Sequence, residues 1–257
     1  MKNLKTASFE RKIKYLIPNI LKKTITKILS HQLIGFLIKK SGIKINLFGG
    51  FFDYSRVNNY EAALIFWGIW ESAEIRFSKR FVNTRVIIEL GSSVGVNFGS
   101  LTHHLKNKKF ICVEASKENF KKLLGLKNQI KLKKKHEYIM LNKAIHYKKN
   151  KIKFKHTSTS GSKIIEKNLD GDEIECITLK QILNNYNINE NYTLISDIEG
   201  TESEIFFKDS ESLKKCTTMI LELENTADYS INDQIKKLNK LNFKVIEKYA
   251  NVFVLKK

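Results

Sequence analysis

Short apolar runs rich in Val and Ile alternate with helical stretches from Arg85 to the end of the chain, and this alternation constrains the fold more than any other feature. Strands separated by helices pair in parallel, because a parallel connection needs a long crossover. The pattern therefore predicts an open α/β sheet, mostly parallel, with helices on both faces. Four of the runs lead into an acidic residue: 86–88 before Glu89, 110–113 before Glu114, 193–195 before Asp197 and 218–221 before Glu222.

Further strand signals lie in the middle of the chain and at its end. Those in the middle occupy residues 138–141, 151–156 and 174–177. The end of the chain is expected to form a helix over 231–241, a strand over 243–246, a tight turn and a strand over 251–255. Two strands joined by so few residues must be antiparallel, so the sheet is expected to end in an antiparallel hairpin strand.

A glycine turn joins the first of these strands to the helix that follows it. It reads Glu-Leu-Gly-Ser-Ser-Val-Gly over residues 89–95 and lacks the Gly-x-Gly-x-x-Gly spacing of dinucleotide-binding proteins. Gly91 and Gly95 let the backbone approach a ligand closely, in the crevice outside the carboxyl ends of the strands. Glu89 lies at the strand end, where a carboxylate can accept hydrogen bonds from an ammonium group.

The acid that follows the second strand completes this pattern. Glu114 lies about twenty residues after the turn, where a carboxylate accepts hydrogen bonds from both ribose hydroxyls of an adenosine ligand. Turn and acid together predict a site for such a ligand. Two alternatives remain open: Glu114 is only a solvent-facing acid, or the ligand is a nicotinamide cofactor, which keeps the acid but needs the other glycine spacing.

With these residues, the sequence resembles the FkbM family of methyltransferases from Glu61 to nearly the C-terminus. The most specific match is Asp-Ile-Glu-Gly-Thr-Glu over residues 197–202, which looks like the family's D-x-E-G-x-E signature. Other matching segments are residues 66–71, 89–95, 113–115 and 142–145. The resemblance implies a class I, Rossmann-like methyltransferase fold. It also implies methyl transfer from S-adenosylmethionine to an oxygen, usually a hydroxyl on a sugar or secondary metabolite.

Two parts of the sequence depart from that family. Ser93 stands where many methyltransferases carry a second glycine in the turn, and residues 1 to about 58 lie outside the resemblance. The cofactor site is nevertheless expected to comprise Glu71, Glu89, Gly91, Ser92, Ser93, Gly95, Asn97, Glu114, Ala115, Asn142, Ala144 and Asp197.

Candidate catalytic residues come from the end of the fourth strand. Methyl transfer at an activated sulfonium needs donor and acceptor to be aligned and the hydroxyl proton to be removed. Asp197 is expected to lie nearest the reacting centre, with Glu199 as the second candidate base. The alternative is that these acids cap the next helix, and for Glu202 we favour capping.

A divalent metal at the same strand ends is an alternative that the sequence does not favour. Asp197, Glu222 and Glu224 are carboxylates that could hold Mg²⁺, but their spacing is not a recognisable ligand motif.

The charge of the chain is concentrated in part at its N-terminus. Lys and Arg number 46 against 26 Asp and Glu, a net charge of +20, but only five of the 46 are Arg, so nucleic acid is an unlikely partner. Residues 1–48 carry eleven Lys and Arg against Glu10. Apolar residues recur at helical spacing from Ile13 to Leu37, which predicts a basic amphipathic helix or pair of helices that Pro18 kinks or restarts.

This pattern divides the chain into an N-terminal helical appendage with its loop, residues 1–58, and a methyltransferase domain, residues 59–257. Through residues 1–45 the appendage could bind an anionic membrane, with its apolar stripe buried and its Lys side chains on the headgroups. The alternatives are that it packs on the main domain or on a second copy of the chain, so an oligomer stays open.

The chain has three Cys without a C-x-x-C spacing and shows no apolar run or leader typical of membrane or secreted proteins. We therefore expect a cytoplasmic protein. Peripheral contact with the inner face of the membrane stays open. We expect an S-adenosylmethionine-dependent O-methyltransferase that acts on a sugar hydroxyl of a surface polysaccharide or glycolipid. The alternative is a non-catalytic basic adaptor that uses a methyltransferase fold to bind an anionic membrane or nucleic acid.

Overall fold

A computed structural model describes residues 19–46, 49–130, 135–155, 163–165 and 172–257. The chain divides into two compact units, and each is considered by itself below. One takes in the residues up to Ile43 together with Tyr54–Trp70, and the other comprises Lys44–Asp53 and Glu71–Lys257.

The first unit is helical. It contains α2 (Asn19–Leu29), α3 (Gln32–Ser41), the 3₁₀ turn η1 (Tyr54–Arg56) and α4 (Asn59–Phe66). The predicted pair of amphipathic helices is present as α2 and α3, and Pro18 lies outside the described residues. Residues 13–18 of that pattern lie outside the described residues. Among the helices that the structure describes, none has the length and apolar character needed to cross a membrane.

The division of the chain differs from the boundary expected after residue 58. A capping box between Asn58 and Glu61 starts α4, which then packs closely on α3. The contact is tightest at Gly35, where an added Cβ would lie 1.6 Å from the carbonyl oxygen of Asn59. Because this packing ties α4 to the N-terminal helices, residues 54–70 fall in the first unit, while residues 44–53 fall in the second.

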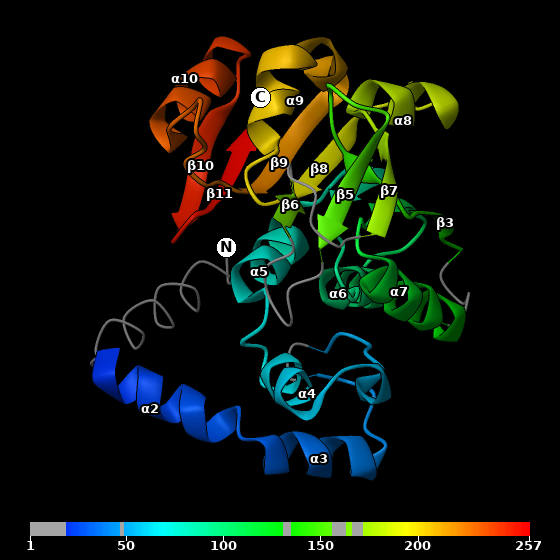
Figure 1. Cartoon of the computed structure of the whole chain (residues 1–257), viewed down its shortest axis with the longest axis vertical. Helices are drawn as coiled ribbons and strands as arrows, with labels where there is room; N and C mark the ends of the chain where they lie inside the picture. Colours follow the sequence, from blue (N-terminus) through cyan, green and yellow to red (C-terminus); the bar gives the residue numbers. More distant parts are fainter. Residues whose placement is uncertain (1–18, 47–48, 131–134, 156–162, 166–171) are drawn as a thin grey trace. The chain divides into compact units, whose positions relative to one another are not determined.

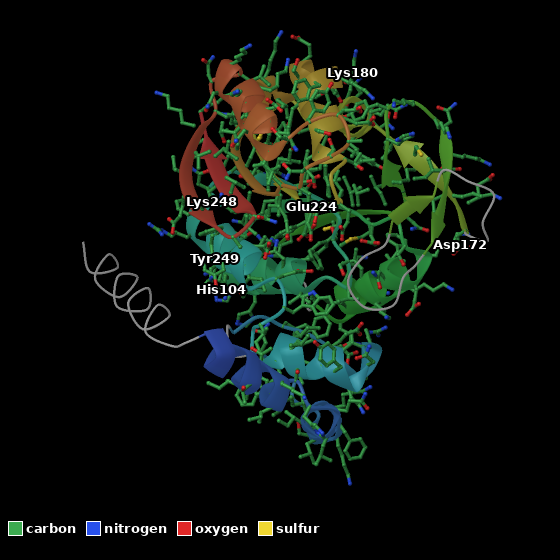
Figure 2. The ribbon with its side chains drawn as sticks, turned by 60° about the vertical axis from the view of Figure 1, so that its left-hand side comes forward. His104, Asp172, Lys180, Glu224, Lys248 and Tyr249 are labelled. Carbon is green, nitrogen blue, oxygen red and sulfur yellow. The ribbon has the colours of Figure 1, made fainter. Side chains whose placement is uncertain are left out.

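The second unit is built on a seven-stranded sheet with the order β10-β11-β9-β8-β1-β2-β3. Its strands are β1 (Val86–Leu90), β2 (Lys109–Val113), β3 (Glu137–Leu141), β8 (Tyr192–Ser196), β9 (Cys216–Glu222), β10 (Lys244–Tyr249) and β11 (Val252–Lys256). Every pair from β9 to β3 is parallel, and β11 is antiparallel to both β9 and β10. The predicted open sheet with a C-terminal antiparallel hairpin strand is therefore confirmed. β10 forms one edge of the sheet and carries Lys248 and Tyr249 (Figure 2).

Helices cover both faces of this sheet, as expected (Figure 1). One face carries α5 (Ser72–Phe81), α6 (Val96–His104) and α7 (Lys117–Gln129), and the other carries α8 (Leu179–Asn185), α9 (Glu202–Lys208), η2 (Ser210–Lys215) and α10 (Ile231–Lys240). Successive side chains of β1 point to opposite faces, so Val86, Ile88 and Leu90 join the core beneath α8 and α9. On the other face the ring of Phe98 in α6 packs edge-on against Phe110 in β2, with centroids 5.4 Å apart.

The remaining strands form a separate small sheet, which the sequence did not predict. It has the order β4-β7-β5-β6 and comprises β4 (Ala144–Ile145), β5 (Lys151–Lys155), β6 (Lys163–Ile165) and β7 (Asp172–Ile177). Its small core contains Ala144, Ile152 and Ile174. Lys residues alternate with apolar residues along β5, and a strand that is apolar on one side only cannot lie inside a sheet covered on both faces. His156, the last residue of the strand predicted here, lies outside the described residues.

The close packing of Gly99 in α6 predicts how a substitution there changes stability. The carbonyl oxygen of Phe51 approaches Gly99 so closely that an added Cβ would lie 2.2 Å from it. Gly99→Ala should lower the free energy of unfolding by about 1 to 3 kcal/mol through overpacking, even though Ala is the better helix former. Equilibrium urea unfolding measures the difference.

The neighbouring variant Ser100→Ala is the matched control. The buried hydroxyl of Ser100 finds no hydrogen-bond partner among the described residues, so its removal should leave stability unchanged or slightly raised. Equal stability of the Gly99→Ala and Ser100→Ala proteins would contradict the packing argument.

Candidate active site

The parallel register brings four strand ends into one row. Leu90 pairs with Val113 on one side and with Ser196 on the other, and Ser196 pairs with Leu221. The next residues along these strands are Gly91, Glu114, Asp197 and Glu222. Three of the four acids at which the sequence placed strand ends thus lie along one edge of the sheet, beside the glycine turn, whereas Glu89 lies two rows earlier within β1.

The glycine turn packs closely against neighbouring segments of the protein. Gly91 has a φ of +78°, and an added Cβ would lie 1.9 Å from the carbonyl oxygen of Asp197. The backbone N–H groups of Gly91 and Ser92 both donate to the carbonyl of Val113, at 2.9 and 3.0 Å. Gly95, with a φ of +88°, backs onto Leu123 in α7. Gly91 is therefore required by a backbone contact and Gly95 by its left-handed φ, whatever part they take in ligand binding.

Glu114 is buried beneath this turn. Its carboxylate accepts from the N–H of Ser93 at 2.8 Å and from the N–H of Ser116 at 2.7 Å, and the residue is only 6% exposed. The alternative of a solvent-facing acid is thereby excluded. Burial raises the pKa of Glu114 to about 7, although the two N–H donors act in the opposite direction. A carboxylate has about four acceptor sites, so two remain for a ligand.

Asn142, Ala115 and Ala144 lie around the segment of the chain that follows β2. The Asn142 amide donates to the carbonyls of Glu114 at 2.8 Å and of Ala115 at 3.1 Å, which fixes the chain after β2. Ala115 packs against the small core to which Ala144 belongs. These three residues therefore connect the end of β2 to the small sheet.

Glu89 and Asn97 form a second buried polar pair. The Asn97 amide donates to the Glu89 carboxylate at 2.8 Å, and the thiol of Cys112 lies 3.7 Å from the other carboxylate oxygen. Burial raises the pKa of Glu89 to about 7. The amide oxygen of Asn97 is buried and has no hydrogen-bond partner among the described residues. Ser92, in the glycine turn, contacts the backbone of Glu89, because its hydroxyl donates to the Glu89 carbonyl at 3.2 Å.

Asp197 is surrounded by further acids. Burial, followed by the charges of Glu222, Glu202 and Glu74, raises the pKa of Asp197 to about 8. Glu74 reaches this cluster from α5 and hydrogen-bonds to Glu222, and its own pKa is raised to about 7, mainly by burial. Glu74 was not predicted from the sequence. Its helical spacing could have indicated it, because Glu74 lies three residues before Phe77 and four before Ser78, on the same buried face of α5.

The two remaining acids of the D-x-E-G-x-E signature differ in role. Glu202 is fully buried, and its carboxylate accepts from the N–H groups of Ile198 at 2.6 Å and Gly200 at 3.0 Å. It therefore holds the turn before α9. The N-cap of α9 is Thr201 and carries no side-chain capping hydrogen bond, so the expected capping of the helix by Glu202 is replaced by this contact with the preceding turn. Glu199 is exposed in that turn, with a left-handed φ of +55°.

Residues at the margin of the site complete the predicted set. Glu71 begins α5, also with a left-handed φ, of +48°. Glu224 is exposed two residues beyond Glu222 and lies near the centre of the view in Figure 2. Within the described part of the chain, no group of three or more His, Cys, Asp and Glu has a geometry suited to a metal ion.

Comparison with protein families identifies the chain. The family model described as the methyltransferase FkbM domain matches residues 93–245, more than half of the sequence. The chain belongs to the FkbM methyltransferase family. This protein is thus a methyltransferase with S-adenosylmethionine as its cofactor. The matched segment begins inside the glycine turn and includes Glu114, Asn142 and the whole D-x-E-G-x-E signature.

Solved structures similar to this FkbM methyltransferase are distant from it. A protein in the NADB-Rossmann superfamily from Streptococcus agalactiae is 12% identical, with a TM-score of 0.43, and the match covers 71% of this chain and 67% of that one. Fibrillarin from Aeropyrum pernix, in complex with natively bound S-adenosyl-L-methionine, is 10% identical, with a TM-score of 0.39 and coverages of 71% and 73%. No curated protein matches the chain.

The polar groups of the site fit the cofactor of this methyltransferase. S-adenosylmethionine offers hydrogen-bond donors in its ammonium group and ribose hydroxyls, and it carries positive charge. The strand ends of the structure offer acceptors in the carboxylates of Glu89 and Glu114 and in the unpartnered amide oxygen of Asn97. An unsatisfied buried acceptor costs free energy, which a donor on the ligand would recover.

The raised pKa values generate a prediction for the protein without cofactor. Burial raises the pKa of Glu89 from its ordinary value of 4.5 to about 7 in the folded protein, so the folded state holds the proton to higher pH. Stability must then fall as pH rises from about 5 to about 7, by up to about 1.4 kcal/mol per pH unit for one such group. Glu89→Gln removes this ionisation, so its Tm relative to the wild type should rise across that window.

The exposed acid Glu211, with a side chain 76% exposed, supplies the control. The Tm of Glu211→Gln relative to the wild type should stay constant between pH 5 and pH 8 in differential scanning calorimetry. A Glu89→Gln difference that is equally constant would show that Glu89 is already ionised at low pH in the folded protein.

Proposed function

We propose that this methyltransferase transfers a methyl group from S-adenosylmethionine to a hydroxyl of a sugar in a surface polysaccharide or glycolipid. The observation that carries the proposal is the position of Asp197, a candidate base directly beside the glycine turn. Its carbonyl oxygen is so close to Gly91 that no side chain fits between them. A ligand held by the turn would lie close to residue 197, whose carboxylate is the candidate base.

The chemistry asks little of the protein beyond alignment and proton removal. S-adenosylmethionine supplies a methyl group on a positively charged sulfur, which makes it ready for in-line displacement. Glu89, Asn97 and Glu114 would bind the donor and fix its orientation, which removes much of the entropic cost of bringing the reactants together.

Asp197 is the proposed base. A general base is most effective when its pKa lies near the operating pH, and burial among other acids raises the pKa of Asp197 to about 8. In its ionised form the carboxylate accepts the proton of the acceptor hydroxyl as the new carbon–oxygen bond forms. Glu199, exposed on the turn that follows, is the second candidate.

The acids around Asp197 support a polyhydroxylated acceptor. Glu74 and Glu222 add carboxyl oxygens beside it, and ionised carboxylates form strong hydrogen bonds with hydroxyl donors. A sugar presents several such donors around the hydroxyl that is methylated. The family resemblance favours the same class of acceptor.

Glu114→Ala tests the cofactor site. We expect cofactor affinity to fall at least tenfold, because two ribose hydroxyls lose a charged acceptor and each such bond contributes about 1.5 to 3 kcal/mol. Isothermal titration calorimetry with S-adenosylmethionine measures the change. Glu118→Ala, which removes an exposed Glu from the next helix, should bind as the wild type does.

Glu114 also holds two backbone N–H groups, so folding of the variant must be checked by circular dichroism and Tm. Glu114→Gln keeps an acceptor for one of them and should also bind more weakly than the wild type. Unchanged affinity in both variants would remove Glu114 from the cofactor site. No binding by the wild type at millimolar cofactor would favour the non-catalytic adaptor.

Asp197→Asn tests the reaction. We expect cofactor affinity within severalfold of wild type and methyl transfer lower by roughly two or more orders of magnitude, as for loss of a positioned base. Mass spectrometry of surface glycans should detect O-methyl sugars in cells that carry the wild type. These sugars should be absent from cells that lack the protein or carry Asp197→Asn.

Glu199→Gln is the matched variant and should keep most of the activity. If Asp197→Asn methylates at nearly the wild-type rate while Glu199→Gln does not, the base is Glu199. Glycans that are identical with and without the wild-type protein would overturn the proposed acceptor and leave the methyltransferase assignment intact.

A further inference from the structure

An exposed apolar stripe runs along the two N-terminal helices of the first unit, which are drawn in blue in Figure 1. Five large apolar side chains there are between 40% and 60% exposed. They are Ile25 and Ile28 on α2 and Leu33, Phe36 and Leu37 on α3. Single exposed apolar residues are ordinary, but five within thirteen residues of two consecutive helices are a local concentration of exposed apolar surface, and such concentrations occur at interaction sites.

α3 packs within its own unit through a different face from the one that carries the exposed apolar residues. Gly35 and Ile38 are buried, and Gly35 is the point of closest contact with α4. At roughly 100° per residue, Leu33, Phe36 and Leu37 lie on the opposite side of the helix. α3 is therefore apolar on two sides, and packing within the first unit covers only one of them.

Charge decides which partner fits the stripe. Residues 19–46 contain six Lys and no Asp or Glu. Lys27 and Lys40 are exposed on the same helices as the stripe. Pairing the stripe with a second copy would bring together two segments of net +6 each, and like charges across an interface oppose association. An anionic surface with an apolar interior is complementary to both properties.

We propose that the α2–α3 stripe docks the protein on an anionic lipid bilayer, with its apolar side chains in the interface and its Lys residues at the headgroups. Amphipathic basic helices bind in this way through buried apolar area together with attraction to anionic lipid. The proposal does not depend on the acceptor of methyl transfer.

Vesicle sedimentation with the full chain tests the proposal. The wild type should bind vesicles of phosphatidylcholine with phosphatidylserine, bind pure phosphatidylcholine poorly, and be released by raised salt, because charge attraction decays over about 8 Å at physiological ionic strength. Lys27→Gln with Lys40→Gln should weaken binding by roughly thirtyfold, from about 1 kcal/mol for each Lys.

The apolar contribution is tested by Leu33→Ser, Phe36→Ser and Leu37→Ser together. This triple variant should lose at least roughly tenfold in vesicle affinity and keep the wild-type Tm and methyl transfer to a soluble acceptor, because these side chains are exposed. Val245→Ser with Ile246→Ser, which alters exposed apolar residues of β10 in the second unit, is the control and should bind vesicles as the wild type does.

Four results would overturn the proposal. Equal binding to neutral and anionic vesicles would remove the role of charge, and full vesicle binding by the triple Ser variant would remove the stripe. A wild-type dimer that the triple variant dissociates, or a Tm that the triple variant lowers by several degrees, would show that protein covers the stripe instead of lipid.

Discussion

Parallel register at one edge of the seven-stranded sheet is the constraint on which the site depends. Because β1, β2, β8 and β9 run in the same direction and are in register at their carboxyl ends, their next residues fall in one row. That row places the glycine turn between Glu114 and Asp197, with Glu222 beyond. Four segments far apart in the sequence thus meet without any flexible loop having to bring them together.

The same edge concentrates ionisable groups in a place that is poorly suited to charge. Glu89, Glu114 and Glu202 are nearly or fully buried, and burial raises the pKa of each to about 7. Taking a carboxylate out of water is unfavourable unless partners compensate, and backbone N–H groups compensate only in part. A cationic ligand bound beside Glu89 and Glu114 would supply the missing compensation, which is why we propose these two acids for the cofactor site.

The sequence was most informative where a local pattern determines the structure. Apolar runs, the glycine turn and strand-end acids predicted the parallel sheet, the hairpin and the neighbourhood of Glu114 and Asp197. It failed where contacts between distant residues decide. Glu74 reaches the site only because α5 packs on the sheet, and residues 54–70 join the first unit only because α4 approaches Gly35. Whether Glu202 caps a turn or acts in catalysis likewise depends on which N–H groups its carboxylate meets.

The contact between Gly91 and Asp197 involves the carbonyl oxygen of Asp197 and not its carboxylate. The glycine turn therefore contacts residue 197 through a backbone atom, which every amino acid has. Glycine at position 91 is fixed by the fold, whereas the side chain at 197 can change without moving the turn. The architecture of this edge therefore does not depend on which side chain stands at position 197, and a substitution there would leave the sheet intact.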